Sequence, residues 1–407
     1  PYELICEDKP DFPLEEAELT FEQWRDYLVH PEDENVNSVF DWRTYIALKQ
    51  GKNRNRYLQF VVKRVHTASE YRKEVIDGLL HIKHTDKQFD ELYSCRKQLL
   101  MGLADSDISE YVLNTKSMGK DRVFYLTDNT MKERKAIMDI MHEQEWIFPD
   151  LEHIYGALMA YMKPYSFSVK NGELLTEYFQ RYKELKVLNI RDEEFIAKVQ
   201  ELAQPGKRVY NSLETRGAVL ENMQEENTFL YWIDALGVEF LSYIQYRASL
   251  NGLRLKINIA RADLPTLTDV NKGFYDCWIG EKSKVTELDD LIHGTSNAHE
   301  NDQQSAAPYY LIRELAIVDE VLDSAKTMMK SHECKQVIIT SDHGASRLAV
   351  TYQNENQHEM ATKGEHSGRC CPCNEVDKRP DCASEENDYW VLANYDRFRG
   401  GRMSSVE

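Results

Sequence analysis

The sequence lacks any long hydrophobic run. No stretch of its 407 residues approaches the roughly 18 consecutive apolar residues of a membrane-spanning helix. Its first residues, PYELICEDKPDF, lack the basic and apolar parts of a signal peptide. We therefore expect a cytoplasmic protein that makes no use of a membrane.

Positive charge is also scarce. The chain has 50 Lys and Arg residues against 69 Asp and Glu residues, which gives a formal net charge of −19. Because such a surface repels nucleic-acid phosphates, the composition excludes a large non-specific DNA-binding face but not one local basic cleft. An acidic protein that handles phosphate groups needs metal ions to supply positive charge. The P-loop and the G-x-G-x-x-G motif are both missing.

Cysteine is sparse, and half of it lies in one cluster near the C-terminal end. Such a distribution favours reduced thiols, with a metal site at the cluster, over the disulfide framework of a secreted protein. The cysteines are Cys6, Cys95, Cys277, Cys334, Cys370, Cys371, Cys373 and Cys382.

The pattern of apolar residues changes near residue 220. Before it, apolar residues recur every three or four positions, as in NTMKERKAIMDIMHEQ, where Asn129 and Thr130 could cap a helix. After it, the apolar segments 228–233, 253–260 and 337–340 read as strands that alternate with helices, which indicates a parallel sheet. We predict a helical scaffold or partner-binding domain over residues 1–220 and an α/β domain over residues 221–407.

Polar residues follow two of these strands directly. Asp234 is the last residue of TFLYWID, and Asp342 and His343 come directly before the final glycine of VIITSDHG. Ligands collect at the carboxyl ends of parallel strands, and both residue types bind zinc. Between them, PTLT places Thr266 and Thr268 in a loop. Two carboxylates, an imidazole and a hydroxyl could bind a divalent metal that activates the hydroxyl; the alternative is a turn in which His343 caps the next helix.

A second group of candidate ligands follows in ELDDLIHG. Asp289 and His293 stand in D-x-x-x-H spacing and could supply two ligands of a second metal.

The segments WIDALG, LPTLTDVNKG, VIITSDHGASRLAV and YWVLANYDRFRGGR resemble the PglZ-domain proteins of bacteriophage exclusion (BREX) systems, in the alkaline phosphatase superfamily. The resemblance covers residues 228–407, and the order of its motifs is fairly specific. It implies an alkaline-phosphatase-like parallel sheet flanked by helices. It also implies a two-metal phosphatase or phosphodiesterase that acts in antiviral defence.

The resemblance further implies roles for single residues. One metal would be held by Asp234, Thr268, Asp342 and His343, and the nucleophile would be Thr268, not Thr266. Asn271 matches a residue that holds phosphoryl oxygens. The second metal would be held by Asp289 and His293, with Asp290 as the alternative to Asp289, and by a further His expected beyond Glu407.

Zinc is the expected catalytic ion at both sites, and manganese suits the same ligands. The expected substrate is a phosphoester, nucleotide or nucleic acid, and the expected partners are other defence proteins such as a DNA methyltransferase. Two alternatives stay open. One is a catalytically weak scaffold that recruits those proteins. The other is a phosphomutase, although such relatives usually carry Ser in place of Thr268.

The cysteine cluster predicts a structural metal site. Cys370, Cys373 and Cys382 form C-x-x-C followed by a third cysteine, and His366 or Cys371 could complete a tetrahedral zinc site. The alternative is a loop of reduced thiols. If the zinc site forms, His366 belongs to it and not to the catalytic centre.

Overall fold

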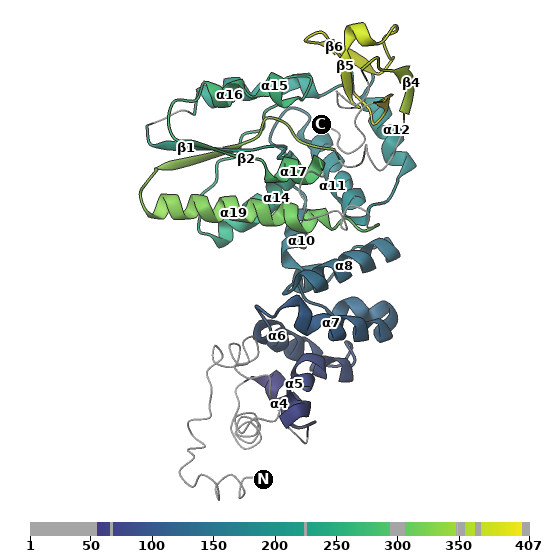
Figure 1. Ribbon diagram of the computed structural model, residues 1–407, viewed down its shortest axis with the longest axis vertical. Helices are drawn as coiled ribbons and strands as arrows, with labels where there is room; N and C mark the ends of the chain where they lie inside the picture. The colour runs from purple at the N-terminus through teal and green to yellow at the C-terminus, as the bar shows by residue number, and fades with distance from the viewer. Residues whose placement is uncertain are drawn as a thin grey trace, which may run out of the picture. The chain divides into compact units, whose positions relative to one another are not determined.

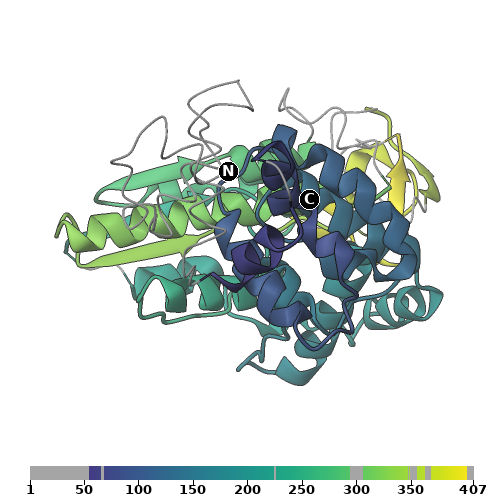
Figure 2. The same ribbon diagram turned by 90° about the horizontal axis from the view of Figure 1, so that it is seen from below.

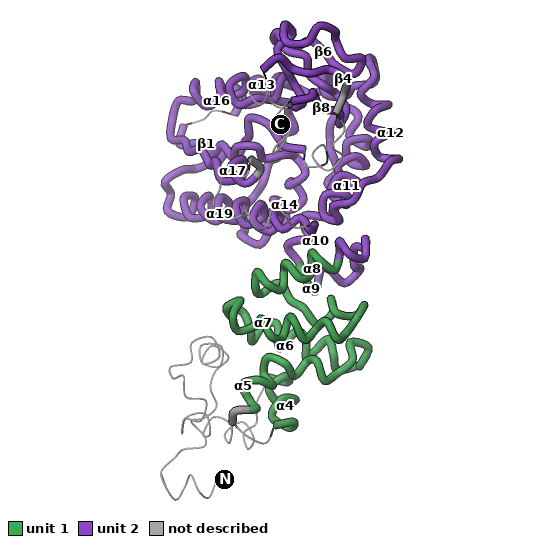
Figure 3. The backbone as a smooth tube through the Cα atoms, turned by 45° about the vertical axis from the view of Figure 1, so that its right-hand side comes forward, with its two compact units in different colours: residues 1–140, 153–155 green, residues 141–152, 156–407 purple. Residues whose placement is uncertain are grey.

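The computed structural model describes residues 55–65, 68–223, 226–293, 306–346, 348, 355–362 and 368–400. These residues divide into two compact units (Figure 3). One comprises residues 1–140 and 153–155, and the other comprises residues 141–152 and 156–407. We expected a domain boundary near residue 220, whereas the contacts group residues 156–220 with the α/β part of the chain.

The described part of the first unit is helical (Figure 1). Thr130 caps α8: the backbone N–H of Glu133 donates to Oγ1 of Thr130, and that hydroxyl donates to Oε2 of Glu133. This confirms the predicted helix start after Thr130. The α-helices up to residue 155 are α4 (Arg56–Val62), α5 (Ala68–Asp77), α6 (Phe89–Leu99), α7 (Asp105–Asn114), α8 (Met131–Gln144) and α9 (Leu151–Ile154), of which α8 and α9 extend into the second unit.

The second unit is built around a parallel three-stranded sheet in the order β2-β1-β3. The strands are β1 (Thr228–Ile233), β2 (Lys282–Val285) and β3 (Gln336–Thr340). The helices of this unit are α10 (Gly156–Met162), α11 (Gly172–Leu188), α12 (Glu193–Leu202), α13 (Arg216–Glu221), α14 (Leu241–Leu250), α15 (Thr268–Asn271), α16 (Gly273–Asp276), α17 (Glu287–His293) and α19 (Tyr310–Lys330). The predicted mixed α/β fold with a parallel sheet is confirmed.

Helices cover both faces of this sheet. Successive strand residues point to opposite faces, and both faces carry apolar side chains that pack against helices. Tyr231 and Ile233 belong to one apolar cluster with residues of α17 and α19. Leu230 belongs to another, with residues of α13 and α16. Figure 1 shows the sheet between α15 and α16 on one side and α14, α17 and α19 on the other. Figure 2 shows α19 running alongside the strands.

One predicted strand is wrong. Residues 253–260 form no strand, and beside them only an isolated bridge pairs Arg261 with Thr215. The place beside β1 is taken by β2, whose sequence KSKV carries two lysines. The alternation of LRLKINIA fits a strand, but half of these residues are exposed, none is buried and none joins the ladder.

Small strands follow the main sheet. An antiparallel sheet has the order β5-β7-β6, and β4 pairs with β8 in parallel. Their common core includes Met360, Cys371, Leu392 and Phe398. The strands are β4 (Glu355–Glu359), β5 (Cys370–Pro372), β6 (Ala383–Glu386), β7 (Tyr389–Leu392) and β8 (Arg397–Arg399). Within the described part of the chain, no helix combines the length and apolar character needed to cross a membrane.

Candidate metal centre

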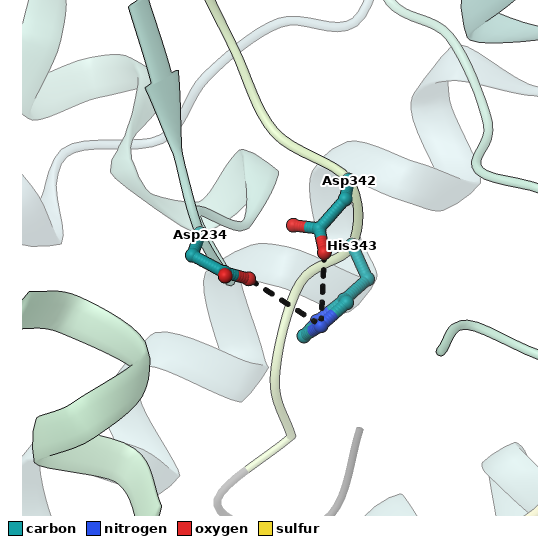
Figure 4. Close-up of side chains that lie close together, drawn as sticks. All are labelled: Asp234, Asp342 and His343. Carbon is teal, nitrogen blue, oxygen red and sulfur yellow. Dashed lines mark ion pairs between the residues drawn. The ribbon is translucent and has the colours of Figure 1, made fainter. Parts of the chain in front are cut away.

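Asp234 and Asp342 lie side by side at one edge of the sheet. Trp232 of β1 is paired with Thr340 of β3. Asp234 lies two residues after Trp232, and Asp342 lies two residues after Thr340, so the two aspartates are level with each other. The strands are parallel, so both carboxylates emerge at their carboxyl ends, together with His343 (Figure 4). Asp342 is 0% exposed, Asp234 3% and His343 4%. The sequence prediction that these three residues converge is confirmed.

The imidazole of His343 faces both carboxylates through one nitrogen. Its Nε2 lies 3.4 Å from Oδ2 of Asp342 and 3.7 Å from Oδ1 of Asp234. The other nitrogen, Nδ1, lies 3.2 Å from the carbonyl oxygen of Gly344. If Nδ1 carries the proton and donates it to that carbonyl, Nε2 keeps a free lone pair directed at the carboxylates, as in a metal-binding histidine.

Thr268 brings a hydroxyl to the same point. It is the first residue of α15, and its Oγ1 donates a 2.8 Å hydrogen bond to Oδ2 of Asp342. The same oxygen lies 3.3 Å from Nε2 of His343. The structure therefore places Thr268 among the predicted ligands. Thr266 instead lines a separate cavity.

The two carboxylates differ in their tendency to bind a proton. Burial, followed by the negative charge of Asp342, raises the pKa of Asp234 to about 6, although Lys284 opposes this shift. Burial also acts to raise the pKa of Asp342. The charge that His343 carries when it is protonated and the hydrogen bond from Thr268 outweigh it, so the pKa of Asp342 lies below its usual range. Asp342 is therefore the carboxylate that stays ionised, and Asp234 is protonated first.

These residues fit a divalent cation. One ligand atom from each of Asp234, Asp342 and His343 lies within 4.8 Å of the others. Oδ1 of Asp234 is buried, and no donor in the described part of the chain forms a hydrogen bond to it. A buried carboxylate oxygen without a donor is costly, and a cation at this point would satisfy it. Two carboxylates, an imidazole and a hydroxyl are ligands that zinc and manganese both accept.

Lys284 also reaches this centre, which sequence reasoning missed. Its Nζ lies 2.5 Å from Oδ2 of Asp234 and 3.8 Å from the ring centroid of Trp232. It comes from β2, where it is paired with Trp232. Because β2 was not predicted as a strand, nothing in the sequence placed Lys284 beside Asp234. One oxygen of Asp234 thus pairs with an ammonium group, and the other is left for a cation.

Arg216, at the start of α13, was missed as well. Its guanidinium donates to the carbonyl oxygens of Ser341 and Asp342 at 3.1 and 2.6 Å, and to the carbonyl oxygen of Asn271 at 2.7 Å. It therefore ties the segment after β3 to the segment that carries Thr268. Burial lowers the pKa of Arg216. A single arginine more than fifty residues before either segment gives no sequence signal for this role.

Asn271 has a framework role in the structure. Its Nδ2 donates to three backbone carbonyl oxygens, of Asp263, Pro265 and Leu267, and its Oδ1 accepts from the backbone N–H of Asp263 and from Arg216. With its amide engaged on both sides and only 1% of the residue exposed, Asn271 braces the loop before Thr268. These contacts give no support to the predicted role in holding phosphoryl oxygens.

The predicted second metal site is not assembled by the described residues. Oδ2 of Asp290 accepts a 3.1 Å hydrogen bond from the hydroxyl of Thr286, the residue directly before α17. Asp289 is near enough for its charge to raise the pKa of Asp234, but it does not join the cluster of candidate ligands. His293 ends α17, and its side chain lies outside what the structure describes.

The cysteines do not form the predicted zinc site among the described residues, because no group of three thiols lies within ligand distance there. Adjacent residues of β5 face opposite ways: Cys370 lines a cavity, while Cys371 belongs to the apolar core of the small strands. Burial raises the pKa of Cys371 to about 12. Cys373 and Cys382 are free thiols, and His366 lies outside the described residues.

A family model described as a domain of unknown function (DUF7863) matches residues 17–144. The match falls mostly in the first unit and ends before every residue of the candidate centre. Comparisons with curated proteins and with solved structures gave no match.

Proposed function

We propose that this chain is a metal-dependent phosphoester hydrolase in which Thr268 is the nucleophile. One observation carries the proposal: a threonine hydroxyl lies within 3.3 Å of both a buried carboxylate oxygen and an imidazole nitrogen, at the carboxyl ends of parallel strands. The Thr268 hydroxyl thus lies against two of the candidate metal ligands, Asp342 and His343. The motif order of the alkaline phosphatase superfamily supports the same assignment.

The ion would be held by Asp234, Asp342, His343 and Thr268. A bound divalent cation supplies positive charge that activates the hydroxyl and neutralises the phosphoryl group. Oδ2 of Asp342 accepts the hydrogen bond of the Thr268 hydroxyl and so orients its lone pairs. The hydroxyl proton of Thr268 passes to Oδ2 of Asp342, which already accepts its hydrogen bond. The bond from Oγ1 to phosphorus forms as the bond from phosphorus to the leaving oxygen breaks, and that oxygen takes up the proton and departs as the alcohol. Water then releases phosphate, or a phosphomonoester, from the phosphothreonine.

The activity test uses p-nitrophenyl phosphate and bis(p-nitrophenyl) phosphate, which separate monoester from diester hydrolysis. With zinc or manganese added, we expect the full chain to hydrolyse at least one of them and Thr268→Ala to lose turnover. Thr327→Ala, which removes a threonine exposed on α19, is the matched control and should retain full activity. Turnover retained by Thr268→Ala would exclude this nucleophile.

A catalytically weak scaffold is the second candidate. The ion pair between Lys284 and Asp234 favours it, because an ammonium group already occupies one oxygen of a candidate ligand. In that case the first unit would bind other defence proteins, such as a DNA methyltransferase, and a metal would chiefly stabilise the second unit. Metal that raises the unfolding temperature, with no hydrolysis of either ester, would support the scaffold.

A further inference from the structure

A cavity of about 340 Å³ lies beside the candidate centre, in the second unit. Ligand sites commonly measure ~300–1,000 Å³ and have mainly apolar walls with a few polar groups. Helices α11 and α12 form one wall, with Leu174, Leu175 and Val199, and the small sheet forms another, with Val391 and Leu392. Both its size and its walls are those of a small-molecule site.

The cavity and the candidate centre share one loop. Residues 264–267 line the cavity, and the next residue is Thr268. The side-chain amide of Asn271 donates to the carbonyl oxygens of Pro265 and Leu267 in this loop. Asn387, at the turn between β6 and β7, donates a 2.7 Å hydrogen bond to the carbonyl oxygen of Leu264. A ligand in the cavity therefore contacts the segment that positions the nucleophile.

The charged residues of the cavity wall are both cations. Arg208 and Arg369 line it, and no carboxylate occurs among the described residues that do so. Backbone contacts fix each guanidinium: Arg208 donates to the carbonyl oxygens of Ala203 and Cys382 at 2.7 and 3.1 Å, and Arg369 donates to that of Leu392 at 3.0 Å. In a chain of net charge −19, such a wall favours an anionic ligand.

Aromatic rings complete the cavity. Tyr178, Phe179 and Tyr210 line it. The Tyr178 hydroxyl is 2.5 Å from that of Tyr395, and the Tyr210 hydroxyl donates a 2.5 Å hydrogen bond to the carbonyl oxygen of Ala262. With their hydroxyls anchored, the two tyrosine rings are held in place, and together with Phe179 they offer apolar surface. Aromatic side chains and guanidinium groups both bind planar rings, through stacking and cation–π contact.

We propose that this cavity binds an aromatic group of nucleoside size carried by the phosphoester substrate. This inference rests on the proposed function, because it places the ring beside the loop of a nucleophile. The ring lies against Tyr178, Phe179 and Tyr210, and the phosphoryl group of the same ligand lies at Thr268. The positive charge of Arg208 and Arg369 attracts this anionic ligand to the cavity. The preferred substrates are thus phosphoesters of aromatic or nucleoside groups, not of short alkyl groups.

The test measures binding to the full chain loaded with zinc, by isothermal titration calorimetry. The probes are thymidine 5′-monophosphate, methyl phosphate and hexyl phosphate. We expect the nucleotide to bind at least about tenfold more tightly than methyl phosphate, the size of effect that one stacked base supplies. Leu174→Trp, which fills the cavity, should remove this preference, whereas Leu250→Trp, at a leucine that is 59% exposed, should keep it.

The outcomes are distinct. Equal binding of nucleotide and methyl phosphate, or a preference unchanged in Leu174→Trp, overturns the proposal. Hexyl phosphate that binds as tightly as the nucleotide overturns the aromatic assignment. Leu175→Trp repeats the test if Leu174→Trp does not unfold cooperatively. Because binding needs no turnover, a ring preference without hydrolysis would leave this cavity assigned and reject the proposed function instead.

Discussion

Trp232 of β1 donates its indole N–H to Oδ1 of Asp342 across the strand interface, at 3.0 Å. The backbone N–H of Ala235 approaches the same oxygen at 3.4 Å. One oxygen of Asp342 is therefore held by the sheet, and the other, Oδ2, faces Thr268 and His343. The sheet thus fixes which carboxylate oxygen is available to a metal.

Trp232→Phe removes that donor and keeps an aromatic ring against Phe274 and Tyr275, whose centroids lie 5.4 and 5.1 Å from that of Trp232. Loss of a hydrogen bond that orients a ligand typically weakens metal binding about 10–100-fold. We expect a loss of this size in zinc affinity, measured by competition with a chromophoric chelator. A cooperative unfolding transition is the control for the fold, and unchanged affinity would contradict the orienting role of Trp232.

Asp234→Asn tests the cation site directly. The amide keeps the shape of the side chain but removes the charge and one acceptor, so we expect the stoichiometric zinc or manganese of the centre to be lost. Asp290→Asn is the matched control, because Asp290 bonds to Thr286 and not to the centre. Metal content after dialysis, measured by plasma mass spectrometry, and anomalous scattering at the zinc edge both report the result. Equal metal content in the two variants would reject this site.

The strand ends of the centre could be predicted from sequence because their residues are local. A short apolar segment followed by Asp at residue 234, and another followed by Asp-His at residues 342–343, is enough to place these side chains at one edge of a parallel sheet. The spacing of Leu311, Leu315 and Leu322 along α19 puts them on one face of the helix, and all three are buried.

The remainder depends on tertiary contacts. KSKV has a single apolar residue, so only its place beside β1 makes it a strand, and Lys284 could not be assigned to Asp234 without it. LRLKINIA has the right alternation but pairs with no strand among the described residues. The C-x-x-C spacing of Cys370 and Cys373 suggested zinc, yet these thiols and that of Cys382 do not gather within ligand distance among the described residues.

Gly344 allows the two loops of the centre to approach each other. A Cβ at this position would lie 3.1 Å from Cα of Gly237, in the loop that follows Asp234. Gly344→Ala should therefore push apart the segments that carry Asp234 and His343. We expect ~1–3 kcal/mol of destabilisation, as for other overpacked sites, and weaker zinc binding.

Gly217→Ala is the control for this substitution, because a Cβ there meets no heavy atom within 4 Å. Gly217 lies inside α13, where alanine should stabilise the helix by ~0.5–1 kcal/mol. Urea denaturation and a zinc titration of both variants measure the two effects. If Gly344→Ala behaves like Gly217→Ala, the close approach of the loops has no role in the centre.

Lys183 makes part of the stability depend on pH. Its ammonium is buried, donating to the carbonyl oxygen of Tyr161 at 2.8 Å and to Oγ of Ser242 at 3.3 Å. Burial lowers the pKa of Lys183 to about 8, although the charge of Glu239 opposes the shift. Between that value and the ordinary lysine pKa of 10.5, the unfolded chain binds a proton that the folded chain does not. The contribution of Lys183 to the free energy of unfolding therefore rises with pH in this window.

Lys183→Met removes the titrating group. We expect the free energy of unfolding of the wild type, minus that of Lys183→Met, to be larger at about pH 9.5 than at about pH 7.5. Subtracting the free energy of unfolding of Lys183→Met from that of the wild type cancels the effect of tyrosines that ionise in the same pH range. Ser242→Ala loses a hydrogen-bond partner but keeps the ammonium, so it should retain the pH dependence of the wild type. Urea denaturation at the two pH values measures these free energies. If the difference between the wild type and Lys183→Met stays constant or falls with pH, burial does not destabilise the Lys183 ammonium.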